Sequence, residues 1–271
     1  MNTARWDKNC VCEVRNVIVV GGTHGNELHG LHLVNEINSK STSMKLERDC
    51  PSISVGGIIG NAAAAAAIGT GAGLRYCDTD LNRCFMLEDL ANGDICSIEG
   101  LRAKELDSLL GPKSSDCPKT DLILDFHSTT SNTGILLLCH PKDTFSLRLI
   151  AHLQSIHPSI SVSMWPDTEV ALLPSIARSG MTVEVGPIPH STNNTDLYQR
   201  TKVVMHEAIL YIEKHNQWVR AGMPPKQQKS IRLQLYTRFA TLGYPRDSNG
   251  MCHPIQSIST SSHRAYFFHC Y

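Results

Sequence analysis

The 271-residue sequence predicts an α/β fold, a mixed β-sheet flanked by helices on both faces. Three observations favour this class. Short β-branched and apolar runs alternate with longer stretches of helical periodicity between residues 14 and 216. Several of the apolar runs end in glycine or polar residues, as strands do where they lead into a helix. A hydrophobic content of 41% is sufficient for the core of one large domain.

The first predicted unit consists of a strand, a glycine turn and a helix. "VRNVIVVGG" (14–22) is a β-branched run that ends in glycines and predicts a buried strand. "NELHGLHLVNEIN" (26–38) has apolar residues at helical spacing, and "SISVGGIIGN" (52–61) predicts the next strand. Residues 62–73, "AAAAAAIGTGAG", have low complexity, and we interpret them as a flexible loop.

The same alternation continues through the rest of this region. A helix over 101–111 ends at a glycine, and Asp143 is expected to cap a later helix. Further strands are predicted over 120–127, 134–139 and 179–187, and further helices over 143–157 and 194–216.

The composition changes after residue 217, and we therefore divide the chain into a main domain, 1–216, and a second part, 217–271. The second part begins with a linker-like segment and is expected to form a short, incomplete β-rich C-terminal appendage. Within it, "IRLQLYTRF" (231–239) is a strand candidate and "YPRDSNG" (244–250) predicts a turn.

The charge balance indicates small-molecule chemistry. Lys+Arg and Asp+Glu both number 25, so no basic field favours nucleic acid or an anionic membrane surface. No apolar run has the length of a membrane helix or a signal peptide. Ten cysteines without a CxxC pair indicate reduced thiols and a cytoplasmic protein. The sequence leaves the oligomeric state, including a homo-oligomer, open.

The first candidate site is the corner "GGTHGNELHG" (21–30). His24 and Glu27, three residues apart where a strand gives way to a helix, could converge on one ion. His127 also follows an apolar strand and could supply the third ligand of a catalytic zinc, which leaves a position for water. The alternative is that all three are turn, cap and core residues, and a single HxxE motif does not decide between the two.

Two other segments carry chemistry-bearing side chains. Arg75, Asn82 and Arg83 lie in "LRYCDTDLNRCF" (74–85), where guanidinium groups could bind a carboxylate or an oxyanion, or simply face solvent. Glu184 lies among small and apolar residues in "TVEVGP", where a carboxylate has a salt-bridge partner or a raised pKa suited to a general base.

The remaining histidines show no convergent pattern. His29 and His32 lie on the first predicted helix at spacings that a metal site could use. We interpret them as surface or core-edge residues without a role in the site.

Taken together, these segments resemble the aspartoacylase and aminoacylase-3 family of zinc N-acyl-amino-acid amidohydrolases. The matching pieces are "GGTHGNELHG", "DTDLNRCF", "DFHSTTSNTG", "SIARSGMTVEVGP" and "YPRDSNG". They occur in the family's order over roughly residues 16 to 250. The resemblance implies a zinc-carboxypeptidase-like fold and hydrolysis of an N-acyl amino acid to a carboxylate and a free amino acid.

The resemblance also implies the roles of particular residues at the reaction centre. His24, Glu27 and His127 correspond to the ligands of one zinc ion per subunit. Glu184 aligns with the general base that activates the attacking water. Because zinc lowers the pKa of water and a carboxylate can accept its proton, this assignment is chemically coherent.

Three further residues correspond to groups that contact the substrate. Arg75 occupies the place of the arginine that polarises the scissile carbonyl. Asn82 and Arg83 match the pair that holds the substrate's α-carboxylate. Asp125, two residues before His127, is either a group behind the metal ligands or a cap for a backbone amide.

The sequence departs from the family in places that affect the substrate. Pro174 stands where aspartoacylases have an arginine that holds the second carboxylate of N-acetyl-aspartate, and Val170 replaces a tyrosine. An unpaired second carboxylate is unfavourable, so we expect a preference for neutral or aromatic N-acyl amino acids. Arg178 is close in sequence and could substitute for the missing cation.

Two other departures concern loops and the C-terminus. The alanine run follows Asn61 where family members have a proline-containing turn, so the placement of Arg75 is open. The tail after Cys252 does not match the family's β-rich C-terminal domain. The alternatives to an active amidohydrolase are a zinc carboxypeptidase, a succinyl-amino-acid desuccinylase, or a truncated inactive binding homologue.

Overall fold

The computed structural model of the chain describes residues 12–67 and 73–222. The strand predicted over 231–239 and the turn at 244–250 lie outside the described residues.

A mixed six-stranded sheet, in the order β2-β1-β3-β6-β4-β5, organises the described part of the chain. β2, β1, β3 and β6 are parallel to one another, whereas β4 pairs antiparallel with β6 and parallel with β5. The strands are β1 (Asn16–Gly21), β2 (Ser54–Ile59), β3 (Leu122–Ser128), β4 (Gly134–Cys139), β5 (Ser161–Met164) and β6 (Ser179–Gly186). The predicted mixed α/β class is therefore confirmed.

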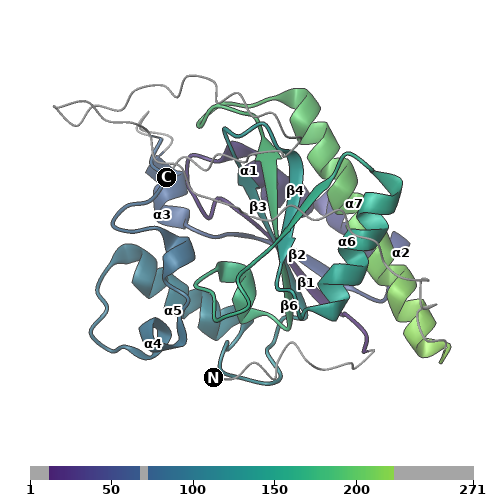
Figure 1. Cartoon of the computed structure of the whole chain (residues 1–271), viewed down its shortest axis with the longest axis horizontal. Helices are drawn as coiled ribbons and strands as arrows, with labels where there is room; N and C mark the ends of the chain where they lie inside the picture. The colour runs from purple at the N-terminus through teal and green to yellow at the C-terminus, as the bar shows by residue number, and fades with distance from the viewer. Residues whose placement is uncertain (1–11, 68–72, 223–271) are drawn as a thin grey trace, which may run out of the picture.

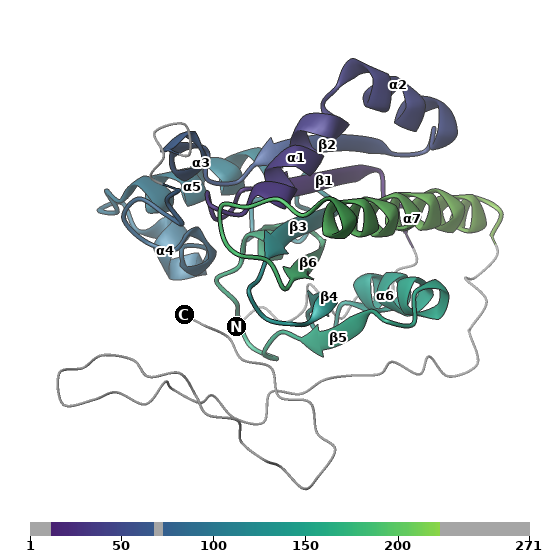
Figure 2. The ribbon, with the colours of Figure 1, turned by 90° about the horizontal axis from the view of Figure 1, so that it is seen from above.

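Helices cover both faces of this sheet (Figures 1 and 2). One face carries α1 (Leu28–Ile37), α2 (Lys40–Asp49), α6 (Thr144–Ile156) and α7 (Thr195–Arg220). The other side carries α3 (Ala62–Ala66), α4 (Leu87–Ala91), α5 (Ile98–Leu110) and the short 3₁₀ helices η3 (Leu81–Arg83) and η4 (Leu173–Ile176).

The core is divided by the alternation of side chains along the central strands. Val17 and Val19 of β1 pack in the cluster formed with α1, α6 and α7, whereas Val20 and Ile123 pack in the cluster formed with α5. Every residue of β3 is buried, which explains the apolar run 122–124 with which it begins. Each fully buried side chain of this kind stabilises the fold by roughly 1.5–3 kcal/mol relative to exposure.

Most of the predicted elements are present, with ends shifted by a few residues. Asp143 caps α6 as predicted, since its Oδ1 accepts the Ser146 N–H at 3.0 Å. The same carboxylate accepts the N–H of Gly180 at 3.1 Å and so ties α6 to β6. α7 continues to Arg220, beyond the end predicted at residue 216.

The interpretation of residues 62–73 as a flexible loop is wrong for its first part. Ala62–Ala66 form α3, and the side chain of Asn61 caps this helix by accepting the Ala64 N–H at 3.1 Å. Alanine has the highest helix propensity, and its small side chain lets α3 lie close to other backbone. Residues 68–72 are outside the described part of the chain.

Besides α3, five elements were not predicted: α2, α4, β5 and the 3₁₀ helices η3 and η4. α2 has no fully buried residue and contacts the core only partly, through Leu46, so most of its sequence is polar. α4 spans only five residues and also buries none, and β5 has four residues. Elements this short or this exposed leave little periodicity in a sequence.

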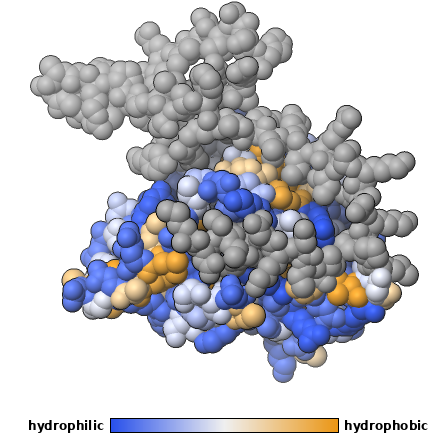
Figure 3. All heavy atoms as spheres, turned by 60° about the horizontal axis from the view of Figure 1, so that its bottom comes forward, coloured by the Kyte–Doolittle hydropathy of each residue, from blue (hydrophilic) through white to orange (hydrophobic). Residues whose placement is uncertain are grey.

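The surface offers no membrane-spanning element among the described helices, none of which is both long and apolar enough. On the face shown in Figure 3, hydrophobic side chains form separate small groups between hydrophilic ones. The seven described cysteines are all free thiols: Cys12, Cys50, Cys77, Cys84, Cys96, Cys117 and Cys139.

Candidate metal centre

The predicted metal ligands and the predicted general base, Glu184, lie near the carboxyl ends of three neighbouring parallel strands. His24 follows β1, and His127 is the penultimate residue of β3. Glu184 of β6 is the Cα partner of His127 in the parallel register. Because these strands run in the same direction, segments far apart in the sequence meet at one edge of the sheet, where open α/β folds bind ligands.

The glycines of the first corner allow a close approach of backbone to backbone. Gly22 has a φ of +67°, a conformation that favours glycine. A Cβ on Gly25 would lie 2.4 Å from the backbone carbonyl carbon of Ala64 in α3. The N–H of Gly25 donates to the Arg75 carbonyl oxygen at 3.0 Å. This tight corner directs His24 and Glu27, which precedes the first turn of α1, toward β3.

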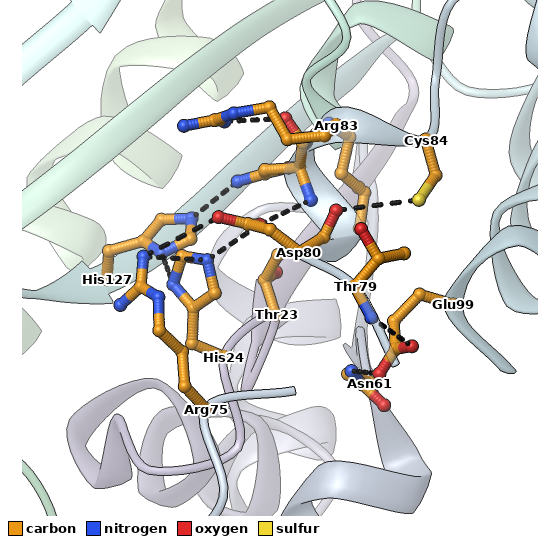
Figure 4. Close-up of polar contacts among 12 residues, drawn as sticks. Thr23, His24, Asn61, Arg75, Thr79, Asp80, Arg83, Cys84, Glu99 and His127 are labelled. Carbon is orange, nitrogen blue, oxygen red and sulfur yellow. Dashed lines mark hydrogen bonds and ion pairs between the residues drawn. The ribbon is translucent and has the colours of Figure 1, made fainter. Parts of the chain in front are cut away.

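His24, Glu27 and His127 form one buried cluster (Figure 4 shows the two histidines and their partners). Glu27 Oε1 lies 2.7 Å from His24 Nδ1, and Glu27 Oε2 lies 3.0 Å from His127 Nδ1. The two Nδ1 atoms are 3.2 Å apart. One ligand atom from each residue lies within 4.8 Å of the other two, so the three side chains could hold a single metal ion.

Carboxylates behind the two imidazoles orient them for this role. His127 Nε2 lies 2.8 Å from Asp125 Oδ2, and His24 Nε2 lies 3.0 Å from Asp80 Oδ1. A carboxylate only accepts hydrogen bonds, so each Nε2 carries a hydrogen, and with a cation in the cluster each Nδ1 would present its lone pair to that cation. Two nitrogen lone pairs and a carboxylate that converge in this way require a cation or a proton between them.

The pKa shifts of the cluster agree with a site that attracts positive charge. Burial alone raises the pKa of Glu27, but His24 and His127 hold the pKa of its carboxyl well below its usual value. Burial lowers the pKa of His127, but Asp125 and Glu27 outweigh it and hold that pKa well above its usual value. The pKa of His24 is also raised, because Glu27 and Asp80 outweigh its burial.

Asp125 is fully buried, and its contacts decide between its two predicted alternatives. Its Oδ2 accepts from His127, and its Oδ1 accepts the hydroxyl hydrogen of Thr23 at 2.7 Å. Asp125 therefore lies behind His127, a candidate metal ligand, as in the carboxylate–histidine pairs of metal sites.

Asp80 is the residue of this site that the sequence did not single out. Besides His24, its Oδ1 accepts the N–H of Asn82 at 2.9 Å, and it caps η3. Burial by itself raises the pKa of Asp80, but the hydrogen bond and charge of His24 and the nearby Arg83 lower it to about 2. The signal available in the sequence was its position in "DTDLNRCF", beside Asn82 and Arg83.

Arg75 reaches the cluster from the loop that follows α3. Its Nη1 donates to Glu27 Oε1 at 3.1 Å, and its Nη2 lies 3.0 Å from His24 Nε2. Because that ring nitrogen donates to Asp80, the second contact places the guanidinium beside the imidazole without a hydrogen bond from it. The Arg75 side chain is 41% exposed, so one side of the guanidinium remains accessible.

Asn82 and Arg83 differ in their relation to the cluster. Asn82 is buried, its Oδ1 accepts the Leu173 N–H at 2.9 Å, and its Nδ2 lies 3.5 Å from Asp125 Oδ2. Arg83 is exposed and donates to the Asn82 carbonyl oxygen at 2.7 Å. The structure thus brings Asn82 against the metal-binding side chains and leaves Arg83 at the edge.

Glu184 is partly buried and projects from β6 to the same face as His127. Burial raises the pKa of its carboxyl, and the charge on Glu27 acts in the same direction against that of His127. Within the described residues, the Glu184 carboxylate forms no hydrogen bond or ion pair. It is available to accept a proton beside the metal-binding cluster.

His29 and His32 are not members of the cluster, as interpreted from the sequence. His29 is buried, and its Nε2 accepts the N–H of Asn194, the N-cap of α7. The His32 ring packs edge-on against Tyr198 of α7, with centroids 6.1 Å apart. Both histidines therefore join α1 to α7.

Arg178, the residue that could replace the arginine missing at Pro174, is paired with Asp121. Pro174 is buried in η4, and the Val170 carbonyl oxygen accepts from Lys113 Nζ at 2.7 Å. Arg178 lies directly before β6, at the opposite end of the strand from Glu184, and contacts Asp121 at 3.1 Å. Six residues of extended strand separate Arg178 from Glu184, or roughly 20 Å.

The fold and the site together define an α/β protein with a buried His-Glu-His group that could hold a metal ion, at the carboxyl ends of its parallel strands. The model of the Succinylglutamate desuccinylase/Aspartoacylase catalytic domain matches residues 13–212. The chain belongs to this family, as its sequence motifs predicted.

Curated relatives and a solved structure extend this match beyond the catalytic domain. A probable aspartoacylase from Nostoc sp. is 34% identical over 247 residues, which are 89% of this chain and 78% of that protein. An N-acyl-aromatic-L-amino acid amidohydrolase (carboxylate-forming) from Rattus norvegicus is 33% identical over 86% of this chain and 70% of its own length. The crystal structure of murine aminoacylase 3 is 30% identical, with a TM-score of 0.71 over 89% of this chain and 76% of that one.

Proposed function

We propose that this protein hydrolyses the amide bond of N-acyl amino acids, with one zinc ion per chain, to give a carboxylate and a free amino acid. The relatives named above act on N-acyl amino acids of aspartate and aromatic type. The observation that carries the proposal is the buried group of His24, Glu27 and His127 with the carboxylate of Glu184 beside it.

The residues present fit zinc by the chemistry of their donors. Two imidazole nitrogens and a carboxylate form a known catalytic zinc set, and both imidazoles are backed by carboxylates. When bound, zinc supplies a Lewis acid that lowers the pKa of water and polarises a carbonyl.

The protein's own residues then supply proton transfer and charge stabilisation. Glu184 takes a proton from the attacking water and passes it to the nitrogen of the leaving amino acid. The exposed side of Arg75 donates hydrogen bonds to the oxygen on which negative charge develops. We assign the substrate's α-carboxylate to Arg83 and to the Asn82 amide nitrogen, whose second hydrogen is not needed by Asp125.

We further propose that neutral or aromatic N-acyl amino acids are preferred over N-acetyl-aspartate. Pro174 supplies no charge, and Arg178 is held by Asp121 at the far end of β6. Lys113 is bound to the Val170 carbonyl and lies 3.3 Å from Glu169. A second substrate carboxylate near Pro174 would lose its hydrating water and gain no cation as a partner, which is unfavourable.

The free thiols of the described cysteines support a reducing compartment, and we propose a cytoplasmic location. The partner that this site implies is a small-molecule substrate.

Turnover of a substrate panel by the purified full chain tests the proposal. N-acetyl-tyrosine, N-acetyl-aspartate and an S-substituted N-acetyl-cysteine are compared by kcat/KM, and we expect the aspartate compound to be the poorest. Preferred turnover of N-acetyl-aspartate would refute the substrate preference inferred from Pro174. No turnover of any compound by zinc-loaded protein would refute the amidohydrolase activity.

A Glu184→Gln variant tests the base within the same assay. We expect it to keep its zinc and to lose kcat by a factor of about 10²–10⁴, the usual contribution of a general base. A variant that retains most of its activity would remove Glu184 from this role.

A further inference from the structure

Glu99, in the first turn of α5, has an environment that neither the motifs nor the proposed reaction explains. Its side chain is 0% exposed. Buried carboxylates of this kind are unusual unless they are fully hydrogen-bonded or paired. Figure 4 shows Glu99 beside Thr79 and Asn61, away from the histidines.

Four donors from two other segments converge on the Glu99 carboxylate. Three are the consecutive backbone N–H groups of Cys77, Asp78 and Thr79, at 2.6, 3.0 and 3.1 Å. The fourth is Nδ2 of Asn61, which donates to Oε1 at 2.9 Å. Burial alone raises the pKa of Glu99, but these hydrogen bonds outweigh it and lower the pKa, so the group is an anion.

The three bound amides lie between two contacts with the metal-binding corner. On one side, the Arg75 carbonyl oxygen accepts the Gly25 N–H, and the Arg75 guanidinium contacts Glu27. On the other side, Asp80 accepts from His24 Nε2. Glu99 thus fixes the backbone that connects the two side chains.

The helix that carries Glu99 is itself anchored to the sheet. Arg102, three residues later, donates to the carbonyl oxygens of Ile59 and Gly60 at 2.8 Å each. Through these bonds, α5 fixes residues 77–79 relative to the end of β2. The end of β2 is in turn bound to β1, because the N–H of Gly60 donates to the carbonyl oxygen of Gly21. Residues 73–80 lie in no regular element. Asp80 and Arg75 therefore need a rigid support of this kind to keep their side chains in place.

We propose that Glu99 is a positioning residue whose buried carboxylate, by binding the N–H groups of Cys77, Asp78 and Thr79, sets Asp80 against His24 and Arg75 against Glu27. Loss of its charge lets this loop move, so that His24 is oriented less well for metal and Arg75 less well for the substrate. The Arg75 half rests on the proposed function, whereas the Asp80 half concerns metal binding alone.

The test is a double-mutant cycle on zinc affinity with the metal-free full chain, measured by competition with a chromophoric chelator. Carboxylates behind metal ligands typically contribute 10–100-fold to metal affinity. We expect Glu99→Gln to raise the zinc dissociation constant about tenfold, and Asp80→Ala to raise it at least as much. If Glu99 acts through Asp80, adding Glu99→Gln to Asp80→Ala changes the constant less than about twofold.

Two results would overturn the proposal. One is an effect of Glu99→Gln that multiplies fully with that of Asp80→Ala, because this would mean that the two residues act independently. The other is an unchanged zinc affinity in folded Glu99→Gln. Glu88→Gln is the matched control, since Glu88 lies on the neighbouring helix α4, is exposed and forms no ion pair among the described residues.

A second variant covers the case in which Glu99→Gln does not fold. Glu99→Asp keeps the charge but withdraws it by one methylene, and we expect a smaller loss of zinc affinity that again disappears in the Asp80→Ala background. Wild-type affinity in Glu99→Asp beside an unfolded Glu99→Gln would show that the carboxylate serves folding only, and would refute the proposal.

The kinetic arm separates this inference from the proposed function. In zinc-saturated protein, Glu99→Gln is expected to lower kcat for N-acetyl-tyrosine, and much less so in an Arg75→Ala background. If the wild-type chain binds zinc but hydrolyses no N-acyl amino acid, the proposed function fails. The double-mutant cycle of Glu99→Gln and Asp80→Ala on zinc affinity still tests the positioning role of Glu99 in that case.

Discussion

At the residue scale, the candidate metal ligands His24 and His127 are each oriented by a carboxylate behind them. His24 and His127 each present Nδ1 to the cluster because a carboxylate holds the opposite ring nitrogen. The orientation of the ligands therefore comes from Asp80 and Asp125, which lie on separate segments of the chain.

This dependence predicts the effect of Asp125→Asn. The amide keeps the shape and can still accept from His127, but it removes a charge that favours a cation at the site. We expect zinc affinity to fall about 10–100-fold while the fold is retained, as measured by chelator competition together with circular dichroism. Asp121→Asn, four residues earlier and in contact with Arg178 instead, is the control. Equal affinities of Asp125→Asn and wild type would mean that Asp125 does not orient His127.

At the element scale, the site is assembled by close contacts between short elements and the ends of strands. α3 approaches the corner after β1 so closely that Gly25 has no room for a Cβ. Asn61 connects α3 to α5, since its Oδ1 caps α3 and its Nδ2 donates to Glu99 of α5. On the other face, α7 packs against α1 and extends the core beneath the site.

Gly25→Ala should disturb both the fold and the metal site. The added methyl group would lie 2.4 Å from the Ala64 carbonyl carbon, and backbone must move to admit it. We expect a loss of about 1–3 kcal/mol in the free energy of unfolding, and weaker zinc binding, by chemical denaturation and chelator competition. Gly93→Ala is the matched control, because a Cβ there meets nothing within 4 Å, and its effect should stay within about 0.5 kcal/mol. Similar stabilities of the two variants would contradict the packing of α3 described here.

The contact between α1 and α7 predicts a pH-dependent stability. Glu36 accepts from Tyr198 Oη at 2.8 Å and lies 2.6 Å from Lys202 Nζ. Burial by itself raises the pKa of Glu36, but Lys202 and Tyr198 outweigh it and lower the pKa below its usual 4.5. Because the folded pKa is lowered, this stabilisation is fully present above pH 4.5 and is lost as the pH falls through the folded pKa.

We therefore expect Glu36→Gln to destabilise the protein by about 1 kcal/mol at pH 7, and the difference from wild type to disappear well below pH 4.5. Urea denaturation at several pH values measures this, with Glu47→Gln on the exposed helix α2 as the control. A difference that persists or grows in acid would contradict the charge interaction.

At the scale of the whole molecule, the sequence predicted the sheet, its buried strands and the corner of the site. It did so because strands buried on both faces leave continuous apolar runs, as in residues 122–124 of β3. It also predicted His24, Glu27 and His127 as one group, since the carboxyl ends of parallel strands meet. The resemblance to the family was needed to choose this reading over a set of turn and core residues.

The missed features share a physical cause. Asp80 contacts His24, 56 positions away in the sequence, and Glu99 contacts Thr79, 20 positions away. No local sequence pattern indicates contacts over such separations. α2 lies on the surface without a buried face, and the alanine run carries no periodicity that separates a helix from a loop. The strand predicted over 231–239 remains a prediction, because it lies outside the described residues.

The central claim is that His24, Glu27 and His127 hold one zinc ion that the protein uses to hydrolyse N-acyl amino acids. The most direct measurement is elemental analysis of the purified chain, wild type and His127→Ala, combined with turnover of N-acetyl-tyrosine before and after chelation and zinc return. We predict one zinc per wild-type chain, activity that is lost with the metal and recovered with it, and neither zinc nor activity in His127→Ala. A wild-type chain that binds no zinc, or that hydrolyses its substrate equally well without it, would contradict the account.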